Sequence, residues 1–164
     1  MIVTTVEKDG FEGILFGGDR TKQKVVIVMS GSNGGMSLTE KEAQFYHQHG
    51  IPALALALFK TKQTQKDLDR VPVEYVERAI AWLKKCGYQR IAIDGTSKGS
   101  ELALLAGSMF PRNNVRDRSC AFLLCKRGTV HERLVKRSVR HLVLELSWKR
   151  AAVCIVQSTK IQHG

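Results

Sequence analysis

The sequence lacks an apolar run long enough to cross a bilayer and lacks cysteines spaced for a metal site. Its longest apolar stretch, residues 51–59, falls far short of the roughly 20 residues that a transmembrane helix needs. The first residues reach Glu7 without a basic start or an apolar core, so we expect no signal peptide and a cytoplasmic protein. The four cysteines form no CxxC pair, which favours reduced thiols. We expect no metal and no cofactor.

Acidic residues are scarce in the last third of the chain. Residues 113–164 hold 3 Asp or Glu against 11 Lys or Arg, whereas residues 1–112 hold 12 against 15. The net charge of +11 therefore does not indicate a nucleic-acid-binding domain spread over the whole chain. It indicates two segments of different composition within a length typical of one domain.

Residues 1–112 alternate predicted strands with predicted helices. A hairpin with an Asp9-Gly10 turn precedes three apolar strands, which are typical of a parallel sheet buried on both faces. A capping box of Thr39 and Glu42 opens the first helix. The order predicts an α/β fold with a mostly parallel sheet, an N-terminal β-hairpin and flanking helices. The expected strands are 2–6, 11–16, 24–29, 51–59 and 90–94, and the expected helices are 39–49, 72–86 and 101–110.

The chemistry is concentrated in one motif, Gly95-Thr96-Ser97-Lys98-Gly99. This G-x-S-x-G pattern lies between a predicted core strand and a predicted helix, which is the setting of a nucleophile elbow. Gly95 and Gly99 allow a tight turn and a close approach of strand and helix. Ser97 is the candidate nucleophile, and the backbone amide of Lys98 is a candidate oxyanion donor. The alternative is that Ser97 only caps the helix.

The second oxyanion donor is expected in a glycine-rich loop. Residues 30–35 read Ser-Gly-Ser-Asn-Gly-Gly and follow the first core strand. An elbow serine receives its second amide from a loop in this position, so the backbone amide of Ser32 is the candidate. The alternative is a plain glycine turn.

Four segments together resemble the C-terminal catalytic domain of the acyl-CoA thioesterase / bile acid-CoA:amino acid N-acyltransferase family. The most specific segment is Ser97-Lys98-Gly99-Ser100-Glu101-Leu102-Ala103-Leu104, and the others are residues 28–35, 50–57 and 72–79. The resemblance covers about residues 24–112. It implies a partial α/β-hydrolase fold and hydrolysis of a thioester through an acyl-serine intermediate, with a small-molecule acyl-CoA or ester as substrate. Some relatives use cysteine where this chain has Ser97.

The catalytic acid and base are not identified. In this fold they follow the nucleophile in the order acid, then histidine, and the family places both beyond the 67 residues that follow Ser97. His47 and His49 lie near the C-terminus of a predicted helix, where the helix dipole explains them. None of the later acids and histidines lies in a recognisable strand-end loop: Glu101, Asp117, Glu132, Glu145, His131, His141 and His163. Each of these histidines is best explained as a solvated surface residue.

The tail, residues 113–164, permits two interpretations. Its apolar residues, from Leu134 to Leu146, are spaced like one face of a basic amphipathic helix. We favour the hypothesis that the tail is an out-of-frame translation, because reading one nucleotide later permits strings that resemble the family's continuation. Some positions there are nearly fixed, since Trp148 followed by Lys149 forces glycine. We expect low order in the tail.

The sequence therefore predicts an acyl-CoA thioesterase-like serine hydrolase with little or no turnover, since no acid or base is identified. One alternative is another α/β-hydrolase, of the dienelactone hydrolase or peptidase type, acting on esters or peptides. A second is a non-catalytic basic protein that uses the tail on nucleic acid or an anionic membrane. We expect no nucleic-acid partner, because the tail's only Phe or Trp residues, Phe122 and Trp148, give little support to base stacking.

Overall fold

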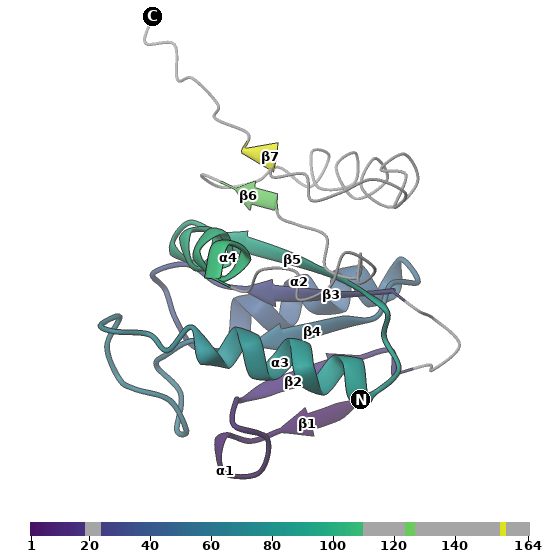
Figure 1. The fold of residues 1–164 in the computed structure, drawn as a ribbon, viewed down its shortest axis with the longest axis horizontal. Helices are drawn as coiled ribbons and strands as arrows, with labels where there is room; N and C mark the ends of the chain where they lie inside the picture. Colours follow the sequence, from purple (N-terminus) through teal and green to yellow (C-terminus); the bar gives the residue numbers. More distant parts are fainter. Residues whose placement is uncertain (19–23, 110–123, 127–154, 157–164) are drawn as a thin grey trace, which may run out of the picture.

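A computed structural model describes residues 1–18, 24–109, 124–126 and 155–156 of the chain (Figure 1). Its elements alternate as the sequence predicts, with each strand from β3 to β5 followed by a helix. In chain order they are β1 Ile2–Thr4, α1 Val6–Asp9, β2 Gly13–Phe16, β3 Lys24–Met29, α2 Ser37–Gln48, β4 Ala53–Leu56, α3 Glu74–Lys85, β5 Arg90–Thr96, α4 Lys98–Met109, β6 Leu124–Lys126 and β7 Ile155–Val156.

The described strands form one sheet in the order β1-β2-β4-β3-β5-β6-β7. The central strand β3 is parallel to both neighbours, with Val28 opposite Ala55 on β4 and Asp94 on β5. β1 and β2 pair antiparallel to each other, and β2 pairs antiparallel to β4. The sheet is therefore mostly but not wholly parallel, and the predicted fold class, with its N-terminal pair of strands, is confirmed.

Helices cover both faces of the sheet (Figure 1). α3 and α4 pack on one face, where Val76 and Ala103 join a core with Ile27 and Ile91. α2 packs on the other, where its Ala43 joins a cluster with the small sheet side chains Ala53 and Ala55. The unbroken apolar pattern of β3 and β4 follows from this arrangement, because both faces of these strands are buried.

Two local predictions are wrong. β1 and β2 are joined by the one-turn helix α1 instead of an Asp-Gly turn, because Thr5 and Asp9 close a helical turn. The Thr5 hydroxyl accepts from the Lys8 amide at 3.3 Å, and the Thr5 amide donates to the Asp9 carboxylate at 3.0 Å. Thr39 does not cap α2, which begins at Ser37. Thr39 lies inside the first turn and is fully buried against the sheet.

The parallel strands bring three loops to one edge of the sheet. β3, β4 and β5 all end there, so residues 30–36, residues 57–73 and the β5–α4 turn lie at the same edge. We call this the carboxyl edge. In Figure 1 it lies on the left, where α4 begins and the long loop after β4 projects.

Most of the tail lies outside the described residues, so the out-of-frame hypothesis and the expected low order stay predictions. The described pieces of the tail are β6, which pairs parallel with β5, and β7, which pairs parallel with β6. Among the described residues, no helix combines the length and the apolar character that crossing a membrane requires.

Candidate active site

Ser97 lies on the turn between β5 and α4, exposed at the carboxyl edge. Its φ of 52° is in the left-handed region, which costs a non-glycine residue energy. A capping serine takes extended backbone instead, so the geometry differs from that of a simple helix cap. The strained strand-to-helix turn is the conformation that a nucleophile elbow requires.

The glycines of the motif make this turn sterically possible. A Cβ at Gly95 would lie 2.5 Å from the carbonyl carbon of Gly99, and a Cβ at Gly99 would collide with the carbonyl oxygen of Ser30. Strand β5, helix α4 and the loop after β3 therefore approach one another more closely than any side chain would permit. The structure thus brings Gly95 and Gly99 together at the base of the turn that presents Ser97.

The glycine-rich loop after β3 lies directly against Ser97. A Cβ at Gly31 would be 2.9 Å from the Ser97 Cβ and 3.6 Å from its hydroxyl oxygen. Ser32 is exposed, one residue beyond this contact. The Lys98 amide belongs to the first turn of α4, whose dipole favours negative charge at its N-terminus. Gly31 and Ser97, which contact each other, directly precede the two candidate amides of Ser32 and Lys98.

The loop after β4 contacts the glycine-rich loop in turn. The amide of Gly35 donates to the carbonyl of Phe59 at 2.8 Å. A Cβ at Gly34 would be 2.9 Å from the Cβ of Lys60. Three loops therefore meet in sequence at the carboxyl edge: the elbow, residues 30–35, and the start of the loop after β4.

The charged side chains beside Ser97 form a local pair. The Lys98 ammonium donates to the Glu101 carboxylate at 2.8 Å on the exposed face of α4's first turn. An exposed pair of this kind contributes little to stability. Glu101 is therefore engaged with Lys98.

The described residues bring no histidine to the carboxyl edge. His47 and His49 lie at the C-terminal end of α2, which runs back along the sheet for about 18 Å. A Cβ at Gly17, which follows β2 at the opposite edge, would be 2.5 Å from the His47 ring. The His49 ring bonds the carbonyl of Phe45 at 2.8 Å. The other candidates lie outside the described residues: Asp117, His131, Glu132, His141, Glu145 and His163.

The described residues also place no three His, Cys, Asp or Glu side chains where they could hold a metal ion. What they hold instead is a buried polar pair that sequence reasoning missed. The Tyr46 hydroxyl donates to the Asp94 carboxylate at 2.7 Å, joining α2 to β5, the strand that precedes Ser97. Burial, with the nearby charge of Asp94, raises the pKa of Tyr46 well above its ordinary value. The signal in the sequence was one acidic residue inside an apolar strand.

Sequence comparison finds relatives for part of the chain. It is 36% identical over 86 residues to human acyl-coenzyme A thioesterase 6, a match that covers 51% of this chain and 20% of the relative. The mouse protein of the same name is 33% identical over 91 residues, which are 54% of this chain and 21% of that protein. The chain thus spans about a fifth of the length of the curated relatives that it matches. No family model matches the chain.

Structural comparison identifies the fold. The esterase Pf2001 of Pyrococcus furiosus superposes with a TM-score of 0.54 at 19% identity, over 89% of this chain and 55% of the esterase. Est1E of Butyrivibrio proteoclasticus, in a structure with bound ferulic acid, superposes with a TM-score of 0.53 at 17% identity, over 73% of this chain and 50% of Est1E. An α/β hydrolase from a Mar Chica lagoon metagenome superposes with a TM-score of 0.52 at 17% identity, over 87% of this chain and 58% of that hydrolase. The chain thus has an α/β-hydrolase fold and is homologous, over about half its length, to acyl-coenzyme A thioesterase 6.

Proposed function

We propose that this chain carries the nucleophile part of an acyl-CoA thioesterase-type serine hydrolase, with Ser97 as the residue that accepts the acyl group. The observation that carries the proposal is the contact between Gly31 and Ser97. It sets a glycine-rich loop against a serine held at a left-handed φ before a helix. The homology to acyl-coenzyme A thioesterase 6 supports a thioester as the substrate.

The chemistry proceeds through two steps. The Ser97 oxygen attacks the thioester carbonyl, the carbon–sulfur bond breaks, and the thiol leaves with the serine's proton. Water then hydrolyses the acyl-serine to a carboxylic acid and regenerates Ser97. In both steps the backbone amides of Lys98 and Ser32 donate to the oxyanion, where such donors contribute most to rate.

The described residues provide no histidine to move the proton, so we expect the acyl-enzyme to form slowly and to persist. Oxyanion donors and substrate binding alone still give about 10³- to 10⁴-fold acceleration over water in serine hydrolases that lack a triad member. Turnover of the full chain should therefore be low.

Mass spectrometry of the full chain after incubation with a short acyl-CoA tests this proposal. We expect one acyl group on the peptide that contains Ser97, none on that peptide in Ser97→Ala, and little release of free thiol beyond one equivalent. A simple ester such as p-nitrophenyl acetate, run in parallel, tests the alternative of an ester hydrolase. Acylation confined to lysines, or an unchanged pattern in Ser97→Ala, would contradict the proposal. Rapid Ser97-dependent turnover would contradict the expected low turnover.

A further inference from the structure

We propose that Lys60 binds a phosphate group of the coenzyme A half of the substrate, an inference that rests on the proposed function. Lys60 is exposed at the start of the loop after β4 and has a φ of 63°. Lysine rarely adopts this left-handed conformation, and residues held in such conformations cluster at functional sites.

The surrounding contacts hold Lys60 in this conformation. Its amide donates to the carbonyl of Gln65 at 2.6 Å, closing the loop on itself. The next residue, Thr61, donates its hydroxyl to the carboxylate of Glu12 and accepts from the Thr64 amide at 3.1 Å. The Gln63 side chain accepts from the amide of Val6, the first residue of α1, at 3.0 Å. The loop is thus fixed before a ligand arrives, which lowers the entropy cost of binding.

The position of Lys60 relative to Ser97 suits the far end of a coenzyme A thioester. Ser97 contacts Gly31, the Gly31 carbonyl accepts from the Gly34 amide at 3.2 Å, and Gly34 lies against Lys60. The glycine-rich loop, residues 31–34, therefore lies between Lys60 and the serine. In coenzyme A the pantetheine arm separates the thioester from the phosphates, so a cation on the neighbouring loop suits the phosphates better than one beside the serine.

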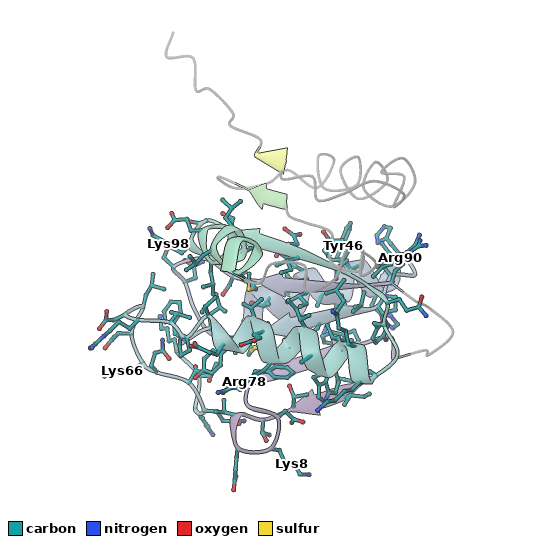
Figure 2. All side chains as sticks on the ribbon, in the orientation of Figure 1. Lys8, Tyr46, Lys66, Arg78, Arg90 and Lys98 are labelled. Carbon is teal, nitrogen blue, oxygen red and sulfur yellow. The ribbon has the colours of Figure 1, made fainter. Side chains whose placement is uncertain are left out.

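The charge of Lys60 is available to such a ligand. Within residues 1–18 and 24–109, Lys60 forms no ion pair, whereas Lys98 beside the serine is paired with Glu101. Figure 2 shows Lys66, from the same loop, and Lys98 on the side of the molecule where the loop after β4 projects. Lysine binds phosphate as a point charge. The loop of residues 57–73 stays positive overall, with Lys60, Lys62, Lys66 and Arg70 against Asp67 and Asp69.

Calorimetric titration of the full chain with coenzyme A, and separately with pantetheine, tests the proposal. In Lys60→Gly, which also relieves the left-handed strain, we expect about tenfold weaker coenzyme A binding, the usual effect of one charge-assisted contact. Lys60→Arg should retain binding. Lys85→Ala removes an equal charge at the far end of α3 and should leave affinity unchanged. Salt should weaken binding of coenzyme A but not of pantetheine.

Equal coenzyme A affinity in Lys60→Gly, or no binding by the wild-type chain, would overturn the phosphate role. A separate assay tests the proposed function: acylation of Ser97 by a thioester of N-acetylcysteamine, which carries no phosphate. If this thioester acylates Ser97 while Lys60→Gly binds coenzyme A as tightly as the wild type, the phosphate role of Lys60 is rejected and the proposed function stands.

Discussion

Gly31 and Ser97, which are 66 residues apart in the chain, lie so close that a Cβ at position 31 would be 2.9 Å from the Cβ of the serine. This contact joins the loop after β3 to the elbow after β5, two neighbouring strands of the parallel sheet. A parallel sheet makes the contact possible, because both strands end at the same edge. Glycine makes it sterically acceptable, and the predictions below begin with this pair.

Gly31→Ala should reduce the reactivity of Ser97 at least about tenfold. The added methyl group meets both the Ser97 Cβ and the Thr96 carbonyl oxygen at 2.9 Å, so the loop must move and carry the Ser32 amide with it. Removing one oxyanion donor costs about 10²- to 10³-fold in serine hydrolases. The rate of Ser97 acylation measures the effect. Gly18→Ala is the matched control and should react like the wild type, because among the described residues its methyl group would meet only Ile2, at 3.5 Å.

Gly99→Ala should lower the free energy of unfolding by at least about 2 kcal/mol, because its methyl group collides with backbone carbonyls that cannot move independently of the sheet. Gly87→Ala offers a comparison, since Gly87 has a φ of 95° but open space around it. Conformational strain alone should cost that variant about 1 kcal/mol. Urea denaturation measures both, and an equal loss in the two variants would show that the close approach at Gly99 is absent.

Tyr46→Phe should destabilise the chain by about 1–3 kcal/mol near neutral pH, because Asp94 loses its buried hydrogen-bond donor. The same variant should change the alkaline limb of the stability profile. The pKa of Tyr46 is raised in the folded state by burial, so this group's contribution is fully present below pH 10 and is lost as the pH rises through the folded pKa.

Urea denaturation between pH 8 and pH 11.5 measures this difference. The wild type should lose more of its stability than Tyr46→Phe over the alkaline part of this range, since the phenylalanine ring does not ionise. Parallel alkaline limbs in the two proteins would mean that the Tyr46 phenol is not buried against Asp94.

The hypothesis that residues 113–164 are translated out of frame is tested by sequencing the coding DNA. If the tail is an out-of-frame translation, reading the next frame from about codon 113 should continue a hydrolase sequence that includes a catalytic acid and a histidine. A next frame that stops early or continues no hydrolase pattern would reject the hypothesis.

The sequence predicted the central architecture because its signals were physical requirements of a buried parallel sheet. The apolar runs at β3, β4 and β5, the glycines of the elbow and the alternation of strands with helices all follow from that requirement. The errors arose where a short sequence motif competed with tertiary burial or with another local motif. Thr39 and Glu42 match a capping box, but burial of Thr39 against the sheet takes precedence. Thr5 and Asp9 cap a helical turn where Asp-Gly indicated a hairpin turn.

The candidate site was predictable in part. Ser97, Gly95, Gly99 and the loop from Ser30 were visible because G-x-S-x-G and a glycine-rich loop have strict steric causes. The strained backbone of Lys60 was not visible, because lysine rarely adopts a positive φ and tertiary contacts impose it. Pairing of Asp94 with Tyr46 required the packing of α2 on its face of the sheet, which periodicity alone does not specify.

The most direct test of the account is site-resolved labelling of the full chain with a fluorophosphonate, whose tetrahedral adduct uses the same oxyanion donors as the acyl transfer step. The account predicts an adduct on Ser97 in preference to the neighbouring Ser30, Ser32 and Ser100, formed slowly because the described residues supply no histidine. Gly31→Ala should diminish the adduct and Gly18→Ala should not. Labelling spread evenly over the serines, or absent from Ser97, would contradict its assignment as the nucleophile.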